Sequence, residues 1–220
     1  MNIFDIIGPI MIGPSSSHTA GVVRIAKITS KLLGETIVKA KVYFSGSFTT
    51  TYKGHGSDKA VMGGLLGYNA DDIRIRDSKN EFIKRKTDIS FDTEDLSEYH
   101  PNTVKIEVTG ESGKRISVIG CSVGGGSILI RRINQYEVQF DATYNTLIIP
   151  HNDISGLIAF VARVIAEHQI NIANMKVFRS ERGGKAIMII ETDQLIGKEI
   201  INQLQSNSNI FEITYLEPIE

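Results

Sequence analysis

The order of the elements after residue 146 constrains the fold more than any other feature of the chain. Hydrophobic periodicity there predicts a strand, a helix, two strands, a helix and a strand, joined by short turns. The predicted elements are residues 147–149, 153–168, 171–178, 185–192, 194–203 and 210–216. This βαββαβ order is typical of a ferredoxin-like domain.

The first helix of this domain has a well-defined packing face. Asp153 is expected to be its N-cap, and Gly156 leaves space for a ligand or a backbone segment to come close. The apolar residues of the predicted packing face are Ile154, Leu157, Ile158, Val161, Val164 and Ile165.

The preceding part of the chain mixes helices and strands without a regular βαβ rhythm, which favours the α+β class. Helices are predicted at residues 18–33, ended by Gly34, and at 57–66. A hairpin followed by a solvated connection is predicted for the charge-dense segment 71–99. The predicted strands are residues 3–12, 39–44, 47–52, 103–109, 115–119 and 128–133. We therefore divide the chain into a mixed α/β domain, 1–143, and the ferredoxin-like domain, 147–220.

Composition excludes several classes of function. The net charge of −1 and the few aromatic residues argue against nucleic-acid and anionic-membrane surfaces. The apolar N-terminus carries Asp5 and two prolines and lacks a basic region, so we expect neither a signal peptide nor a membrane span, and a cytoplasmic location. Cys121 is the one cysteine, which excludes disulfide scaffolds and metal sites built from several thiolates of this chain.

The stretch GPSSSHTAG, residues 13–21, is a helix start with more polar side chains than one cap needs. Helix N-termini present free N–H donors and the positive end of a dipole, so added hydroxyls and an imidazole suit a carboxylate or phosphate. The candidate anion-facing residues are Ser15, Ser16, Ser17, His18 and Thr19. A helix cap without a ligand remains the alternative.

A catalytic Ser–His pair is the less favoured interpretation of this stretch. Ser17 and His18 are adjacent, so at a helix start their side chains diverge by about 100°. The motif does not match GxSxG, and no acidic partner for His18 is apparent, which argues against a serine hydrolase.

A second histidine, His55, stands at another helix start in GHGSD, residues 54–58. A plain turn capped by Ser57 or Asp58 is the alternative to a functional role. Two such helix starts in one domain indicate that both histidines face one cleft. Zinc bound by the two histidines would lack further ligands. The paired Gly63 and Gly64 of the following helix indicate close packing on a neighbour.

Two remaining features have structural interpretations. The run Gly124–Gly126 fits neither GxGxxG nor a P-loop, so we expect a strand connection or a bulge. Cys121 is expected to be a small buried hydrophobic residue.

Taken together, GPSSSHTAG, GHGSD and SVGGGSI, followed by the βαββαβ pattern, resemble the β chain of bacterial iron–sulfur-dependent L-serine dehydratases (L-serine ammonia-lyases). The resemblance covers essentially the whole chain. It implies that the second domain is an ACT domain. It also implies that the first domain is similar to the allosteric substrate-binding domain of some D-3-phosphoglycerate dehydrogenases.

The resemblance implies a reaction that dehydrates L-serine to aminoacrylate, which becomes pyruvate and ammonia. A [4Fe–4S] cluster acts on serine as a Lewis acid in this family, and such a cluster needs several thiolates. Its ligands are therefore expected on a separate α chain, whose active site this chain completes, without activity alone. His18 and His55 are then the candidates for acid–base work, and Ser15, Ser16, Ser17 and Thr19 for binding the serine carboxylate.

In ACT domains the first loop commonly binds an amino acid. The corresponding candidates here are Asn152, Asp153 and Gly156, although Ser155 stands where proline is usual. A module that self-associates or docks without a ligand is the alternative for this domain. For the whole chain, the alternative to a lyase subunit is an amino-acid-sensing regulatory module without a catalytic role.

Overall fold

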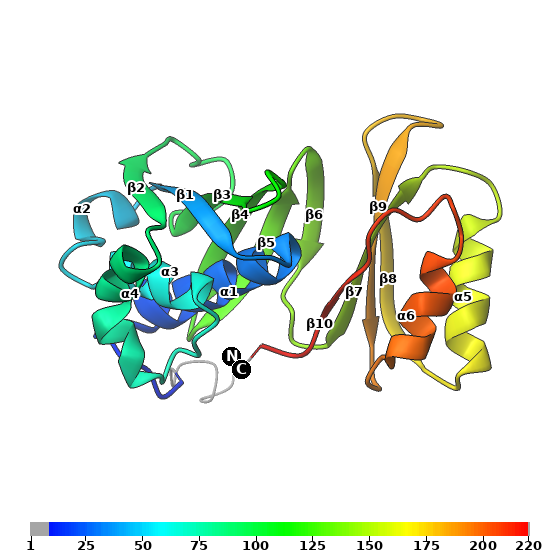
Figure 1. Cartoon of the computed structure of the whole chain (residues 1–220), viewed down its shortest axis with the longest axis horizontal. Helices are drawn as coiled ribbons and strands as arrows, with labels where there is room; N and C mark the ends of the chain where they lie inside the picture. Colours follow the sequence, from blue (N-terminus) through cyan, green and yellow to red (C-terminus); the bar gives the residue numbers. More distant parts are fainter. Residues whose placement is uncertain (1–8, 220) are drawn as a thin grey trace. The chain divides into compact units, whose positions relative to one another are not determined.

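The structure, a computed structural model, describes residues 9–219. The chain forms two compact units that divide between Asn134 and Gln135 (Figure 1). The domain bounds 1–143 and 147–220 stay a prediction. The strands predicted at 3–12 lie partly outside the described residues, and residues 9–12 form no strand. Pro9 has no N–H for a ladder, and the Ile12 N–H donates to the Ala70 carbonyl at 2.7 Å.

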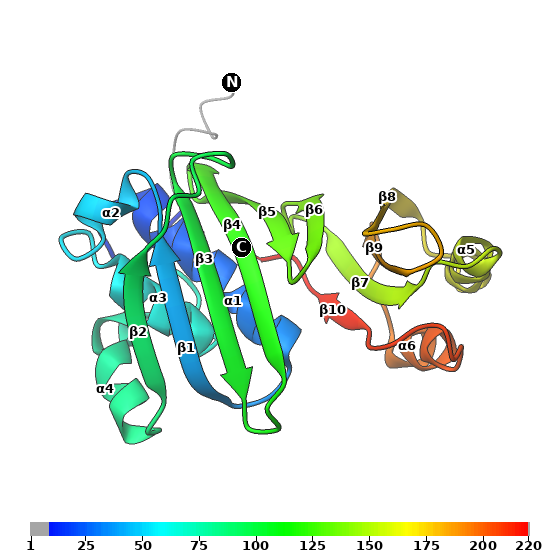
Figure 2. The same cartoon turned by 90° about the horizontal axis from the view of Figure 1, so that it is seen from above.

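The first unit is built on a sheet with the strand order β2-β1-β3-β4-β5 (Figure 2). β1 and β2 run parallel, whereas β1–β3, β3–β4 and β4–β5 are antiparallel. Two helices, α1 (Val22–Leu33) and α3 (Ser57–Leu65), lie together on this sheet, with α1 against β3 and β4. The strands are β1 (Ile37–Phe44), β2 (Asp88–Thr93), β3 (Thr103–Gly110), β4 (Arg115–Gly124) and β5 (Ser127–Ile133).

The GPSSSHTAG stretch starts the long helix, as predicted. A π-helical turn, Ser16–Gly21, leads directly into α1, and single π-turns are frequent at functional sites. Ser15 is the N-cap, because its Oγ accepts the His18 N–H at 3.2 Å. Gly34 ends α1 in the left-handed conformation, with φ of 75°, which confirms its predicted role.

Close packing of α3 on its neighbours explains the paired glycines, because Gly64 faces α1 and Gly63 faces the segment that carries Ile75. A Cβ on Gly64 would lie 2.3 Å from the Val23 carbonyl oxygen, and one on Gly63 would lie 2.8 Å from the Ile75 side chain. Only glycine allows these approaches. The packing therefore holds together the two helices whose N-terminal segments carry His18 and His55.

Residues 47–52 contain a short helix, α2 (Phe48–Thr51), so the strand predicted there is wrong. Threonine favours strands, but here two threonine hydroxyls return to the backbone. Thr49 Oγ1 donates to the Gly46 carbonyl at 2.8 Å, and Thr51 Oγ1 donates to the Ser47 carbonyl at 2.7 Å. These local bonds close a helical turn and leave Ser47 at its start.

The hairpin predicted within 71–99 is also wrong, whereas the solvated connection after it is confirmed at residues 94–99, which form an irregular segment that is buried only at Leu96. The segment contains a 3₁₀ helix (Ile73–Asp77), α4 (Ser78–Lys84) and β2. Asp72 caps the 3₁₀ helix by accepting the Arg74 N–H at 2.9 Å. Ile75 and Phe82 are buried, so two apolar residues anchor a segment whose other positions are mostly charged.

The second unit has the predicted βαββαβ order, preceded by a strand, β6 (Tyr136–Phe140), that the sequence analysis missed. Its antiparallel sheet has the order β10-β7-β9-β8, with both helices on one face (Figure 1). The elements are β7 (Asn145–Asn152), α5 (Leu157–Glu167), β8 (Ile172–Arg179), β9 (Lys185–Thr192), α6 (Lys198–Gln205) and β10 (Thr214–Leu216). The α+β class is confirmed.

The start of α5 differs from the prediction. The helix begins at Leu157, and its N-cap is Gly156 in the left-handed conformation, with φ of 84°. Asp153 does not cap it, because its carboxylate accepts the Gly183 N–H at 3.0 Å in the β8–β9 turn. On the predicted packing face, Leu157, Val161, Val164 and Ile165 are buried, whereas Ile154 and Ile158 are 46% and 48% exposed.

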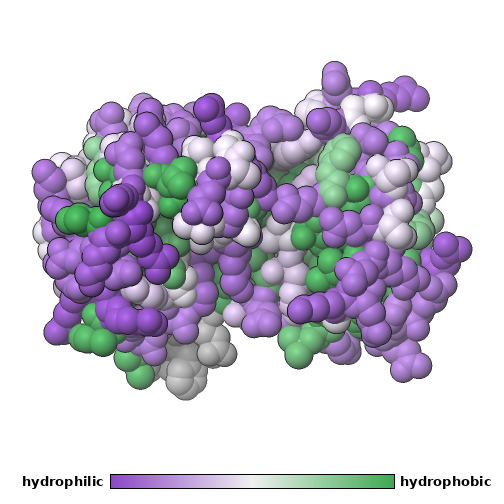
Figure 3. All heavy atoms as spheres, in the orientation of Figure 1, coloured by the Kyte–Doolittle hydropathy of each residue, from purple (hydrophilic) through white to green (hydrophobic). Residues whose placement is uncertain are grey.

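On the face seen in Figure 3, hydrophobic residues are scattered among hydrophilic ones. Within residues 9–219, no helix combines the length and apolar character needed to cross a membrane.

Candidate functional site

The two histidine-bearing motifs meet in the first unit. The ring centroids of His18 and His55 lie 4.8 Å apart in an edge-to-face arrangement, with an interplanar angle of 77°. His18 comes from the π-helical turn before α1, and His55 from the loop before α3. The structure therefore brings together the two histidines whose convergence the sequence analysis expected.

The ring of His18 has a polar partner at each nitrogen. Ser15 Oγ lies 3.0 Å from Nδ1, and Ser47 Oγ lies 3.1 Å from Nε2. Ser47 in turn donates its hydroxyl proton to Asn102 Oδ1. The ring plane is thus set by groups on three separate segments of the chain.

The environment of His18 favours its neutral form. Burial lowers the pKa of His18 below the ordinary 6.5, and the neighbouring His55 lowers it further by charge repulsion. The Phe48 ring meets His18 edge-on, with centroids 4.8 Å apart, and supplies part of the apolar surface. A neutral imidazole near pH 7 is able to accept a proton.

The loop that carries His55 is held by Gly56 and by backbone hydrogen bonds. Gly56 adopts the left-handed conformation, with φ of 70°, and is the N-cap of α3. The His55 N–H donates to the Thr51 carbonyl at 2.9 Å. This turn aims the imidazole at His18.

Three buried polar atoms of the two motifs have no hydrogen-bond partner among the described residues. They are Thr19 Oγ1, His55 Nδ1 and Ser57 Oγ. A buried polar atom without a partner costs about 1–3 kcal/mol. This cost falls on the two motifs that carry His18 and His55.

The remaining candidates in the first motif lie in different surroundings. Ser16 and Ser17 are half-buried in the π-helical turn. Thr19 is buried beneath Gly13, where a Cβ would lie 2.3 Å from Thr19 Oγ1. The structure thus joins Ser15, His18 and His55 in one cluster and packs Thr19 into the layer below. The roles of these residues stay predictions.

A cationic cavity opens beside His55. Its volume is about 330 Å³, and residues 12–14 and 53–56 line it. Lys53, Lys59 and Arg76 also contribute to its wall and are exposed. Three positive side chains around a small cavity favour an anion such as a carboxylate.

Ser47, Asn102 and this cationic wall were not among the site residues predicted from the sequence. Ser47 lay in a segment interpreted as a strand, and Asn102 lies in a loop without a motif. Their approach depends on a tertiary contact, the bond from the Ser47 N–H to the Pro101 carbonyl at 2.9 Å.

Cys121 and the glycine run have the structural roles predicted for them. Cys121 is 1% exposed, burial raises the pKa of its thiol, and its sulfur lies 3.4 Å from Thr103 Oγ1. Gly124–Gly126 connect β4 to β5 with positive φ angles of 110°, 58° and 83°. Among the described residues, no three His, Cys, Asp or Glu side chains are grouped to hold a metal ion.

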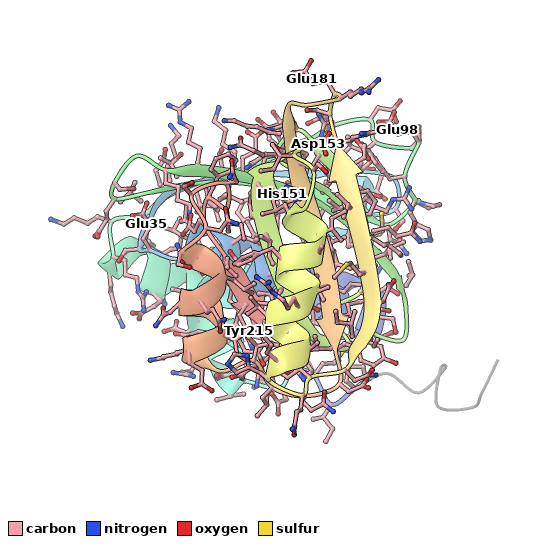
Figure 4. All side chains as sticks on the ribbon, turned by 90° about the vertical axis from the view of Figure 1, so that its right-hand side faces the viewer. Glu35, Glu98, His151, Asp153, Glu181 and Tyr215 are labelled. Atoms are coloured by element: carbon pink, nitrogen blue, oxygen red, sulfur yellow. The ribbon has the colours of Figure 1, made fainter. Side chains whose placement is uncertain are left out.

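The candidate ACT loop bonds to its own unit. Asn152 Nδ2 donates to Asn209 Oδ1 at 3.1 Å, and Asp153 accepts from Arg179 at 3.4 Å in addition to Gly183. Figure 4 shows Asp153 at the end of the unit where the β8–β9 turn lies. Gly156 has open space where a Cβ would be. Ligand binding by Asn152, Asp153 and Gly156 stays a prediction.

Comparison with known proteins finds one family match in each part of the chain. Residues 2–86 match the family model described as serine dehydratase beta chain, and residues 146–209 match the ACT domain. The chain is 43% identical to the probable L-serine dehydratase, beta chain, of Bacillus subtilis, over 97% of this chain and 96% of the relative. It is 32% identical to the L-serine dehydratase, beta chain, of Peptoniphilus asaccharolyticus, over 97% of each.

A D-3-phosphoglycerate dehydrogenase of Bacillus subtilis is 24% identical over 88% of this chain, which spans 37% of that relative. The resemblances to the serine dehydratase β chain, to the ACT domain and to part of the dehydrogenase are therefore confirmed. Both β-chain relatives match this chain over nearly its whole length and over nearly their own whole length. The chain belongs to the family of L-serine dehydratase beta chains.

Proposed function

We propose that this chain is the β subunit of an L-serine ammonia-lyase and contributes His18 and His55 to an active site completed by a separate α chain. The observation that carries the proposal is the 4.8 Å separation of the two imidazole rings, which come from motifs far apart in the sequence. Membership in the L-serine dehydratase family supports L-serine as the substrate. The proposed reaction converts it into pyruvate and ammonia.

The iron–sulfur cluster of the proposed enzyme does not fit this chain. A [4Fe–4S] cluster needs several thiolates, and the one cysteine here is buried between β3 and β4 with a raised thiol pKa. We therefore assign the cluster to the α chain and derive no step through it. The β chain alone is then inactive.

The residues of this chain have two tasks in the proposed reaction. Lys53, Lys59 and Arg76 beside the cavity, with the hydroxyls of the first motif, favour the serine carboxylate. Loss of water from serine removes a proton from Cα and adds a proton to the departing hydroxyl. His18 and His55 are the groups able to take and give these protons near pH 7. We leave the acid and base unassigned between them.

The remaining parts of the proposal concern partners and location. The α chain is the principal partner, and the ACT domain favours self-association of the β chain. A cytoplasmic location suits an enzyme of amino-acid metabolism. The ACT match also favours a second candidate function, an amino-acid-sensing module without a catalytic role.

Reconstitution distinguishes these functions. The chain is mixed anaerobically with a cluster-bearing α chain, and pyruvate formation from L-serine is followed. We expect activity from the mixture and none from either chain alone. Activity of this chain alone and free of iron would overturn the proposal. Serine binding to this chain by calorimetry, with no lyase activity in the mixture, would favour the sensing module.

A further inference from the structure

Ser47 and Asn102 form a hydrogen-bond chain that ends on the ring of His18. Ser47 donates to Asn102 Oδ1, and its oxygen lies 3.1 Å from His18 Nε2. A serine hydroxyl has one proton, which is already used for Asn102. Ser47 Oγ therefore accepts from His18, and the proton of the neutral ring is on Nε2.

The contacts of Ser15 on the other side of the ring agree with a proton on Nε2. Ser15 Oγ accepts the His18 N–H at 3.2 Å and lies 3.0 Å from Nδ1. With the proton on Nε2, Nδ1 is an acceptor, and the Ser15 hydroxyl donates to it. The hydroxyls of Ser15 and Ser47 then each donate one hydrogen bond and accept one.

The backbone holds this series in place. The Ser47 N–H donates to the Pro101 carbonyl at 2.9 Å, and the Asn102 carbonyl accepts the Ser122 N–H at 2.9 Å. Gly46 allows the first contact, because a Cβ there would lie 2.0 Å from Pro101 O and its φ is 58°. The two partners thus come from loops fixed to each other and to β4.

We propose that Ser47 and Asn102 are positioning residues that hold His18 in the Nε2–H tautomer, with Nδ1 unprotonated as the acceptor of the Ser15 hydroxyl. The inference deepens the proposed function and rests on it for the reaction, but the tautomer itself is a property of this chain. His55 is the titratable group in ring contact with His18, and it contacts the ring without a hydrogen bond that fixes either nitrogen.

Nitrogen NMR of the full-length chain tests the tautomer directly. The chain is labelled with ¹⁵N-histidine, and two-bond ¹H–¹⁵N correlations are recorded at a pH where His18 is neutral. The His18 signals are identified by their loss in His18→Gln. We expect the resonance of a protonated nitrogen at Nε2 and of an unprotonated nitrogen at Nδ1. The reverse pattern would overturn the proposal.

Matched variants then test the two positioning residues. In Ser47→Ala and Asn102→Ala, we expect the two nitrogen resonances to move toward each other as the Nδ1–H tautomer becomes populated. Asn102→Asp keeps an acceptor oxygen and should preserve the wild-type pattern. Ser206→Ala is the control, because its hydroxyl bonds the Gln203 carbonyl at the end of α6 in the second unit. An unchanged pattern in both alanine variants, or an inverted one in Asn102→Asp, would contradict the proposal.

Kinetics of the reconstituted αβ enzyme separate this inference from the proposed function. We expect kcat to fall about 10- to 100-fold in Ser47→Ala with KM little changed, by analogy with partners that orient a metal-binding imidazole. Asn102→Asp should retain more activity than Asn102→Ala. A shifted tautomer with unchanged kcat would support the hydrogen-bond assignment and remove His18 from the reaction. An unshifted tautomer overturns the positioning role whatever the activity.

Discussion

The ring of His18 is surrounded by groups that keep it neutral. Partial burial is the larger cause of its lowered pKa, and the second imidazole adds charge repulsion. The unfolded chain binds a proton at His18 more tightly than the folded chain, so its neutral form stabilises the fold fully above pH 6.5. This contribution is lost as the pH falls from 6.5 through the lower pKa of the folded state. The same shift keeps a proton acceptor available below pH 6.5.

Replacing His55 tests this account of the pKa. In His55→Gln, the pKa of His18 should rise toward 6.5, because the repulsive charge is gone, but should stay below 6.5 because the burial remains. The His18 ring-proton shift is followed by NMR against pH. The control is His168→Gln, in α5's C-terminal turn of the second unit, which should leave the titration unchanged. A lowered or unchanged pKa in His55→Gln would refute the electrostatic part of the account.

Packing between elements, rather than any single motif, places the site. α1 and α3 approach closely at Gly64, and their N-terminal segments carry the two histidines. In the second unit, Asp153 joins the β7–α5 loop to the β8–β9 turn. The first contact is tested by the free energy of unfolding, and the second by hydrogen exchange.

Gly64→Ala should destabilise the first unit. The added methyl would lie 2.3 Å from the Val23 carbonyl and 2.7 Å from the Ala26 Cβ, so the helices must separate. Overpacking of this kind costs about 1–3 kcal/mol of unfolding free energy. Gly54→Ala is the control, since its Cβ would make only an ordinary 3.7 Å contact with Thr51 O. Equal denaturant midpoints for the two variants would argue against the close helix contact.

Asp153→Ala should loosen the β8–β9 turn. A backbone bond from Gly183, and then Arg179, holds the pKa of this carboxyl below its usual range, so the ionised oxygen is the acceptor in use. Hydrogen exchange at the Gly183 amide should accelerate in Asp153→Ala and much less in Asp153→Asn, which keeps an acceptor. Protection that survives in Asp153→Ala would show that the turn does not depend on this bond.

The sequence predicted the elements that have strong local signals. A proline and serines ahead of an apolar period predicted the start of α1, Gly34 predicted its end, and the βαββαβ order was recognisable throughout. It misjudged α2, because the preference of Thr49 and Thr51 for strands was outweighed by their bonds to the backbone. His18 and His55 were identified, but not Ser47 and Asn102, since no local pattern reports a contact between distant loops.

At the scale of the whole molecule, the chemistry of the proposed enzyme is divided between two chains. This chain offers imidazoles, hydroxyls and a cationic cavity, and its single thiol is buried in the sheet. Such a set binds and moves protons but does not hold a cluster. In the proposed enzyme the metal would therefore come from the α chain.

Cys121→Ala tests that division. We expect the reconstituted enzyme to keep its iron and sulfide content and its kcat, because the thiol lies against Thr103 and is not a cluster ligand. The loss of a small buried side chain should cost about 1 kcal/mol of stability. Loss of the cluster from a folded Cys121→Ala enzyme would place a ligand on this chain.

The most direct test of the central claim is the kcat of the reconstituted enzyme carrying His18→Ala, with iron and sulfide measured in the same sample. We predict that kcat falls about 10²- to 10⁴-fold while the cluster content stays unchanged, as expected for loss of a group that moves a proton in the reaction. His168→Ala, in the second unit, serves as the matched control and should retain wild-type activity. Unchanged kcat and KM in His18→Ala, with the cluster intact, would remove this histidine from the active site and contradict the account.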